Sequence, residues 1–199
     1  MNRDTDIPNV LAIAGVDPSG GAGVLADVKT ISALGAYACG VVAALTAQNT
    51  RAVAGVSPVA PPFVAQQIDT LFADVAIAAV KIGMLGQAGV IATVADRLAH
   101  WQAARIVLDP VMVAKSGDAL LAPEASAALI ADLLPLATVV TPNLHEAGVL
   151  LGRPVRTFDD MIAAATAIHA LGPGAVLVKG GHTIDAAGDS LTAEAGCVL

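Results

Sequence analysis

The stretch that decides the fold runs from Val10 to Asp27 and reads VLAIAGVDPSGGAGVLAD. It begins as an apolar run, passes through an Asp-Pro-Ser turn and a cluster of glycines, and continues into a segment with helical character. A buried strand that ends in a glycine-rich turn at a helix start directs backbone N–H groups and the positive end of the helix dipole toward one point. We therefore expect a polar or anionic small molecule to bind there.

The same turn also satisfies a loose dinucleotide-binding pattern. Residues 21–26 read GAGVLA, which fits G-x-G-x-x-A. The acid that binds the ribose of NAD is expected about 20 residues after the glycines, but the second apolar run ends instead in Ala47-Gln48-Asn49. The Walker pattern G-x-x-x-x-G-K-[ST] is absent as well. An NAD-dependent oxidoreductase is thus the least favoured alternative, and a Walker-type NTPase is excluded.

The rest of the chain repeats the order of strand and helix. Apolar runs predict strands at Val10–Val16, Ala36–Thr46, Val75–Ile82, Arg105–Val111, Thr138–Thr141 and Ala175–Val178. Helical spacing predicts helices at Gly23–Leu34, Pro62–Phe72, Gly89–Trp101, Pro123–Leu134, Asn143–Leu151 and Phe158–Leu171. Strands that are apolar on both faces and separated by helices indicate a mainly parallel sheet with helices on both faces. The predicted fold is therefore α/β with three layers.

Composition and charge restrict the class of protein. The chain has 199 residues, of which 56% are hydrophobic and 14% charged, so one domain spanning 1–199 is expected. The net charge of -7 and the lack of any Lys/Arg cluster argue against nucleic acid as a partner. The start MNRDTDIPN is acidic, unlike a signal peptide, and no uncharged apolar stretch approaches the roughly 18 residues of a membrane span. We expect no membrane association and a cytoplasmic location.

The cysteines and histidines do not suggest a metal centre. Cys39 and Cys197 lack metal-ligand spacing, and so do His145, His169 and His182. Cys39 stands in an apolar run, where a buried thiol is expected.

Polar residues collect where the predicted strands end. They are Asp17 and Ser19, Gln48-Asn49-Thr50, Lys81 with Gly83-Met84, Asp109, Thr141 with Asn143 and Glu146, and Lys179-Gly180-Gly181-His182. Each of these residues, taken alone, could belong to an ordinary turn. Ligands of open parallel sheets bind outside the carboxyl ends of the strands, however, so the recurrence predicts one shared cleft.

Three of these positions suit particular ligands. The amide of Gln48 can read the donor and acceptor edge of a heterocycle. The carboxylate of Asp109 stands in the apolar run VLDPV, where burial is costly unless it is paired, hydrated or near a cation, which favours a functional role. Lys179, followed by glycines, suits a phosphate.

Two other positions remain open between a structural and a functional role. Asp27 lies about one turn into the first predicted helix, where an acid is favoured by the helix dipole whether or not it binds a ligand. Asn143 and Glu146 form an Asn-x-x-Glu pattern, which is typical of a helix cap and equally compatible with a functional role.

Five segments of the chain resemble the hydroxymethylpyrimidine and hydroxymethylpyrimidine-phosphate kinases of thiamine biosynthesis, which have the ribokinase-like fold. They are residues 14–50 (AGVDPSGG to TAQNT), 81–86 (KIGMLG), 107–121 (VLDPVMVAKSGDALL), 133–152 (LLPLATVVTPNLHEAGVLLG) and 174–182 (GAVLVKGGH). The resemblance implies phosphoryl transfer that depends on ATP and Mg²⁺. The acceptors would be 4-amino-5-hydroxymethyl-2-methylpyrimidine and then its monophosphate, and a homodimer is also implied.

The resemblance also implies roles for individual residues. Those that would enclose the pyrimidine are Gly15, Asp27, Gln48 and Met84, with Val111 beside the ring. Those that would face ATP phosphates and magnesium are Asp109, Asn143, Glu146, Lys179 and Gly180, with Asp109 and Glu146 as the candidate metal ligands. A pyridoxal kinase of the same fold is the alternative enzyme, and the combination of Gln48-Asn49 with Gly83-Met84 favours the pyrimidine.

The resemblance stops short of one family segment. In the family, KGGH is followed by a hairpin, here expected at Asp189-Ser190-Leu191 with its turn at Glu194-Ala195-Gly196, and then by a Gly-Thr-Gly-Cys segment. That segment supplies the anion hole and the catalytic residue, which we therefore expect beyond Leu199. Cys197 is expected to belong to the hairpin. A catalytically impaired pyrimidine-binding fragment is thus a further alternative.

Overall fold

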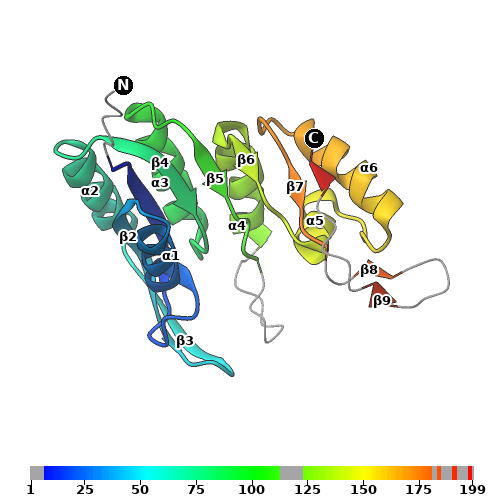
Figure 1. The fold of residues 1–199 in the computed structure, drawn as a ribbon, viewed down its shortest axis with the longest axis horizontal. Coiled ribbons are helices and arrows are strands. Elements are labelled where there is room, and N and C mark those ends of the chain that lie inside the picture. The colour runs from blue at the N-terminus through cyan, green and yellow to red at the C-terminus, as the bar shows by residue number, and fades with distance from the viewer. Residues whose placement is uncertain (1–6, 113–122, 181–182, 185–189, 192–196, 199) are drawn as a thin grey trace.

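The computed structural model describes residues 7–112, 123–180, 183–184, 190–191 and 197–198, and a six-stranded sheet forms its middle layer (Figure 1). The order of the strands is β3-β2-β1-β4-β5-β6. Their bounds are β1 Asn9–Val16, β2 Tyr37–Gln48, β3 Val53–Pro58, β4 Ile77–Ile82, β5 Ile106–Leu108 and β6 Val139–Val140. The strand β7 (Leu177–Val178) continues this layer through a parallel bridge from Val176 to Val140.

Every pairing in the six-stranded sheet is parallel except that of β2 with β3. All six predicted strands are present, so the mainly parallel sheet is confirmed. The edge strand β3 was not predicted, because VAGVSP contains a glycine and a proline and is exposed along most of its length. The predicted run Arg105–Val111 is a strand only as far as Leu108, since Pro110 has no N–H to donate to a neighbour.

The predicted helices are also present. They are α1 Gly23–Ala33, α2 Pro61–Phe72, α3 Ala88–His100, α4 Pro123–Ala128, α5 Leu144–Leu151 and α6 Phe158–His169. After α4 the chain winds on through a π-helical turn, Leu129–Leu133, and a 3-10 turn, Leu134–Leu136. Capping boxes begin α5 and α6, and Gly152 ends α5 in the left-handed conformation.

Helices cover both faces of the sheet (Figure 1). The helix α1 lies against β1 and β2, where Gly40 makes room for it: a Cβ at position 40 would lie 2.8 Å from Val24 Cγ1. On the opposite face, Val41 of β2 joins the main core together with Val64 and Ile68 of α2. The helices α3 and α4 continue that layer, and α6 packs against β7 and β10 (Cys197–Val198). This is the expected three-layer α/β arrangement.

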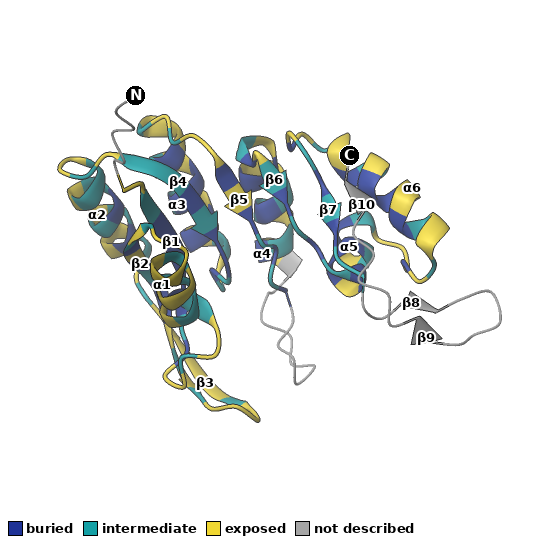
Figure 2. Ribbon diagram, in the orientation of Figure 1, coloured by how far each residue is buried: buried dark blue, intermediate teal, exposed yellow. Residues whose placement is uncertain are grey.

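The two faces of β5 differ in exposure. Ile106 and Leu108 are 3% and 0% exposed and belong to the main core, whereas Val107 between them is 36% exposed. Figure 2 shows this change along β5. The described helices therefore cover β5 on one face and leave the other partly open.

This difference predicts that shortening the two side chains will lower the free energy of unfolding by unequal amounts. Leu108→Ala is expected to lower the free energy of unfolding by about 2–5 kcal/mol, because it opens a cavity in a packed core. Val107→Ala is expected to cost about 0.5 kcal/mol or less, since its side chain keeps much of its contact with water. Urea unfolding of both variants provides the comparison. Equal losses would contradict the assignment of the two faces.

The end of the chain differs in part from the prediction. A hairpin is present, but it pairs β8 (Thr183–Ile184) with β9 (Ser190–Leu191). Cys197 lies in β10, which pairs antiparallel with β7, so its assignment to the hairpin is wrong. The expected turn at residues 194–196, together with Gly181, His182 and Asp189, lies outside the described residues.

Two expectations from composition can be compared with the structure. Cys39 is a buried free thiol, as predicted, and burial raises its pKa. In the described part of the chain, no helix combines the length and the apolar character needed to cross a membrane.

Candidate active site

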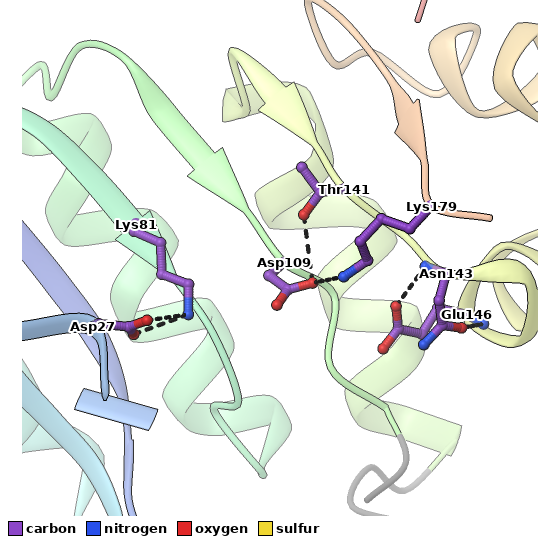
Figure 3. Close-up of polar contacts among 7 residues, drawn as sticks. All are labelled: Asp27, Lys81, Asp109, Thr141, Asn143, Glu146 and Lys179. Atoms are coloured by element: carbon purple, nitrogen blue, oxygen red, sulfur yellow. Dashed lines mark hydrogen bonds and ion pairs between the residues drawn. The ribbon is translucent and has the colours of Figure 1, made fainter. Parts of the chain in front are cut away.

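Some of the polar side chains predicted at the strand ends lie along one edge of the sheet, in two groups (Figure 3): Lys81, Asp109, Thr141, Asn143, Glu146 and Lys179. One group pairs Asp27 of α1 with Lys81 of β4. The other gathers Asp109, Thr141, Asn143, Glu146 and Lys179 around the ends of β5, β6 and β7. The groups stand on adjoining strands, because Lys81 is the register partner of Val107, two residues before Asp109.

The glycine-rich turn after β1 is held by Asp17. Its carboxylate accepts hydrogen bonds at 2.8 Å from the backbone N–H and from the hydroxyl of Ser19. Burial raises the pKa of Asp17, but these bonds and those from the N–H groups of Gly21 and Ala22 outweigh burial, so the pKa lies below its ordinary value. The side chain therefore fixes the turn as an anion.

Glycine is required where this turn enters α1. Gly23 has a φ of 58°, and a Cβ at this position would collide with the carbonyl oxygen of Gly15. The start of α1 is thus pressed against the end of β1, as the opening sequence suggested.

Gly15 and Met84, two of the residues predicted to enclose the pyrimidine, are in contact. The N–H of Gly15 donates to the carbonyl oxygen of Met84 at 3.0 Å. A Cβ at position 15 would lie 2.9 Å from Met84 Cε, so a larger residue would displace the methionine. The structure therefore brings together the end of β1 and the loop after β4.

Gln48 ends β2, and Val111 follows β5, which is separated from β2 in the sheet by β1 and β4. The Oε1 atom of Gln48 lies 3.2 Å from the hydroxyl of Thr46, which in turn lies 2.9 Å from the carbonyl oxygen of Val16 at the end of β1. Val111 follows Asp109 in a tight turn, with its N–H donating to the Asp109 carbonyl oxygen at 2.8 Å. Both side chains are partly exposed, so they are accessible from the edge of the sheet.

The second group is organised around Asp109. Lys179 Nζ donates to Asp109 Oδ1 at 2.7 Å, and Thr141 Oγ1 lies 3.4 Å from the same oxygen. The backbone holds both partners in place, since the N–H of Asp109 donates to Ile82 and that of Lys179 donates to Pro142. The cost of placing Asp109 in an apolar run is thus offset by a paired cation, as the sequence required.

Asn143 and Glu146 form a capping box at the start of α5. The Glu146 N–H donates to Asn143 Oδ1 at 2.9 Å, and the Asn143 N–H donates to Glu146 Oε2 at 2.8 Å. Burial raises the pKa of Glu146 above its ordinary value; the N–H of Asn143 and the charge of Lys179 lower it, and the charge of Asp109 raises it. A structural role as a helix cap and a functional role are therefore compatible for Glu146, because its carboxyl group also interacts electrostatically with Lys179 and Asp109.

The raised pKa of Glu146 predicts a pH-dependent stability. An acid whose pKa is higher in the folded state destabilises that state as the pH rises above its unfolded value, here 4.5, through the folded value. Glu146→Gln keeps an acceptor for the cap and removes this titration. The free energy of unfolding of the variant relative to the original should therefore increase as the pH rises above 4.5. Urea titrations across this range test the expectation, which a constant difference would contradict.

A hollow of about 880 Å³ opens beside this group. The predicted residues Asn143, Lys179 and Gly180 line it, and so do His145, Arg153 and Arg156. Its volume lies in the range of small-molecule sites. The two arginines are not among the site residues predicted from the sequence, although GRPVR at 152–156 places two cations close together in a chain of net charge -7.

The residues present fit a magnesium ion that is bound together with a nucleotide. Within the described ranges no group of three or more His, Cys, Asp or Glu side chains could hold a metal. Mg²⁺ commonly binds through one or two carboxylates plus substrate phosphates, and Asp109 and Glu146 supply two carboxylates here. Nucleotide phosphates would have to complete such a site.

The chain is similar to known kinases over most of its length. It matches the phosphomethylpyrimidine kinase family over residues 17–198. It is 53% identical over 178 residues to the hydroxymethylpyrimidine/phosphomethylpyrimidine kinase of Escherichia coli (strain K12), a match covering 89% of this chain and 67% of that protein. The chain thus spans about two thirds of the length of this relative.

Two solved structures have the same fold. Phosphomethylpyrimidine kinase from Clostridium difficile 630 superposes with a TM-score of 0.84 and 41% identity, over 96% of this chain and 83% of that one. The ADP complex of Bacillus subtilis pyridoxal kinase superposes with a TM-score of 0.82 and 34% identity, over 97% of this chain and 74% of that one. The fold is shared by a phosphomethylpyrimidine kinase and a pyridoxal kinase, so substrate choice has to be argued from the site.

Proposed function

The chain belongs to the phosphomethylpyrimidine kinase family, and we propose from this that it phosphorylates 4-amino-5-hydroxymethyl-2-methylpyrimidine and then the resulting monophosphate, with ATP as donor, in thiamine biosynthesis. The observation that carries the proposal is the division of one sheet edge into two adjoining groups. One is suited to a neutral heterocycle and the other to phosphates.

On the pyrimidine side, Gln48 and Asp27 would recognise the ring. The amide of Gln48 offers both a donor and an acceptor, which matches the ring nitrogen and amino group of an aminopyrimidine. The carboxylate of Asp27 is an acceptor only and suits an amino group. The Gly15 and Met84 contact would supply an apolar wall for the ring.

On the phosphate side, Lys179 would place a positive charge against the nucleotide, in the hollow that it shares with Gly180. Asp109 and Glu146 would hold Mg²⁺, which neutralises phosphate charge. Phosphoryl transfer depends mainly on positioning and charge neutralisation, so these residues would align donor and acceptor. None of these residues is assigned as the group that accepts the proton of the hydroxymethyl oxygen. The family resemblance places that group in the segment after the hairpin.

Pyridoxal is the second candidate substrate, because pyridoxal kinase has the same fold. The pairing of Gln48-Asn49 with Gly83-Met84 favours the pyrimidine, since it resembles the pyrimidine kinases more closely. A kinase assay with MgATP, on this chain extended by the Gly-Thr-Gly-Cys segment that the family has after the hairpin, tests the proposal. We expect ADP formation that requires the pyrimidine, with products carrying one and then two phosphoryl groups by mass spectrometry. Turnover of pyridoxal in preference to the pyrimidine would contradict the proposed substrate.

A further inference from the structure

We propose that Lys81 is a positioning residue for the pyrimidine, which acts by holding the Asp27 carboxylate in the orientation that accepts a hydrogen bond from the amino group of the ring. The inference rests on the proposed function, because it concerns the same substrate. Lys81 stands in the group proposed for the pyrimidine, but no role of its own has been given to it above.

The ion pair is well defined. Lys81 Nζ donates to Oδ1 and to Oδ2 of Asp27, at 2.9 Å in each case (Figure 3). The lysine side chain is 28% exposed and that of the aspartate 17%, so the pair is mostly withdrawn from water. Its neighbours in β4, Val80 and Ile82, are buried in the main core, which places Lys81 on the opposite face, the face of α1.

Small residues make room for the ammonium group. The residue of β1 that pairs with Lys81 is Ala12. A Cβ at Gly83 would lie 3.1 Å from Lys81 Nζ and 3.1 Å from the Cβ of Ala14, so a larger residue there would crowd the lysine. Gly83 is followed directly by Met84, the residue in contact with Gly15. The ion pair therefore stands beside the proposed wall of the pyrimidine site.

The geometry leaves part of the carboxylate available. A carboxylate has about four lone-pair positions on its two oxygens, and Lys81 occupies one on each oxygen. A contact to both oxygens fixes the plane of the carboxylate, while the remaining positions can accept from a ligand. Without Lys81, the Asp27 side chain is free to rotate toward water, and the acceptor has to be oriented again each time the ligand binds.

A purely structural tie between α1 and β4 makes a different prediction. Loss of such a tie would reduce stability and would affect both ligands of the cleft to a similar degree. Loss of a positioning residue affects the pyrimidine alone, and a residue that restores the contact to both oxygens restores its binding. Arginine can form such a contact with a carboxylate, whereas methionine keeps only the apolar stem.

Calorimetric titration of the 199-residue chain with the pyrimidine and, separately, with MgATP tests the proposal. We expect Lys81→Met to weaken pyrimidine binding by about tenfold or more and to leave MgATP affinity within about twofold. Lys81→Arg is expected to recover most of the loss. The matched control is Arg97→Met, which removes a cation paired with Asp69 and Asp96 on α2 and α3 and should change neither affinity.

An analogue that lacks the ring amino group, 5-hydroxymethyl-2-methylpyrimidine, adds a second measurement. It should bind more weakly than the parent compound to the original chain and should be almost insensitive to Lys81→Met. If Lys81→Met does not fold, Lys81→Gln replaces it, with the same loss expected.

The outcomes separate this inference from the proposed function. If the original chain does not bind the pyrimidine, the proposed function fails. If it does, and a folded Lys81→Met or Lys81→Gln protein binds the pyrimidine equally tightly, the inference is wrong. Equal weakening of pyrimidine and MgATP binding, or of parent compound and analogue, would likewise overturn it in favour of the structural tie.

Discussion

Lys179→Met is expected to weaken MgATP binding by about 2–3 kcal/mol, or about 30-fold to 150-fold. The lysine lines the hollow proposed for the nucleotide, and its ammonium group is the cation paired with Asp109 at 2.7 Å. Its loss removes a charged donor to phosphate and also leaves the Asp109 carboxylate, which repels phosphate, without its partner. Calorimetry with MgATP measures the change.

The effect should be confined to the nucleotide. Pyrimidine affinity is expected to change by about twofold or less, because Lys179 belongs to the other group of the edge. Lys179→Arg, which preserves the charge, should lose less than Lys179→Met, and Arg97→Met provides a control for loss of an ion-paired cation elsewhere. If Lys179→Met binds MgATP as tightly as the original chain, the nucleotide is not bound at this group.

Gln48→Ala is expected to have the converse effect. Truncation leaves donor and acceptor atoms of the bound ring without partners, at a cost of about 1–3 kcal/mol, or about fivefold to 150-fold in pyrimidine affinity. MgATP affinity should remain nearly unchanged. Because Gln48 is partly exposed at a strand end, the variant should fold normally.

Equal losses for the two ligands would contradict the assignment of Gln48. Gln66→Ala is a matched control, since Gln66 is an exposed glutamine on α2. It should leave both affinities within about twofold.

The strands and helices could be predicted because the chain alternates long apolar runs with amphipathic segments. The edge strand β3 could not, because its side chains are mostly exposed and provide no apolar pattern. The partner of Cys197 could not be predicted either, because two-residue strands such as β10 carry too little pattern to indicate which neighbour they pair with.

The candidate site could be predicted as a set of strand ends but not as a set of contacts. The rule for parallel sheets places Lys81, Asp109 and Lys179 at one edge, and the structure confirms it. Which carboxylate each lysine pairs with depends on side chains from segments far apart in the sequence. The pairing of Lys81 with Asp27, in particular, needs the space above Gly83, which no local pattern indicates.

A calorimetric competition between 4-amino-5-hydroxymethyl-2-methylpyrimidine and pyridoxal tests the central claim most directly. The 199-residue chain is titrated with each compound alone and then with each in the presence of the other, so that shared occupancy of one site is measured together with preference. We predict saturable binding of the pyrimidine, displacement of pyridoxal by it, and a clearly lower dissociation constant for the pyrimidine. Tighter binding of pyridoxal, or no competition between the two compounds, would contradict the account.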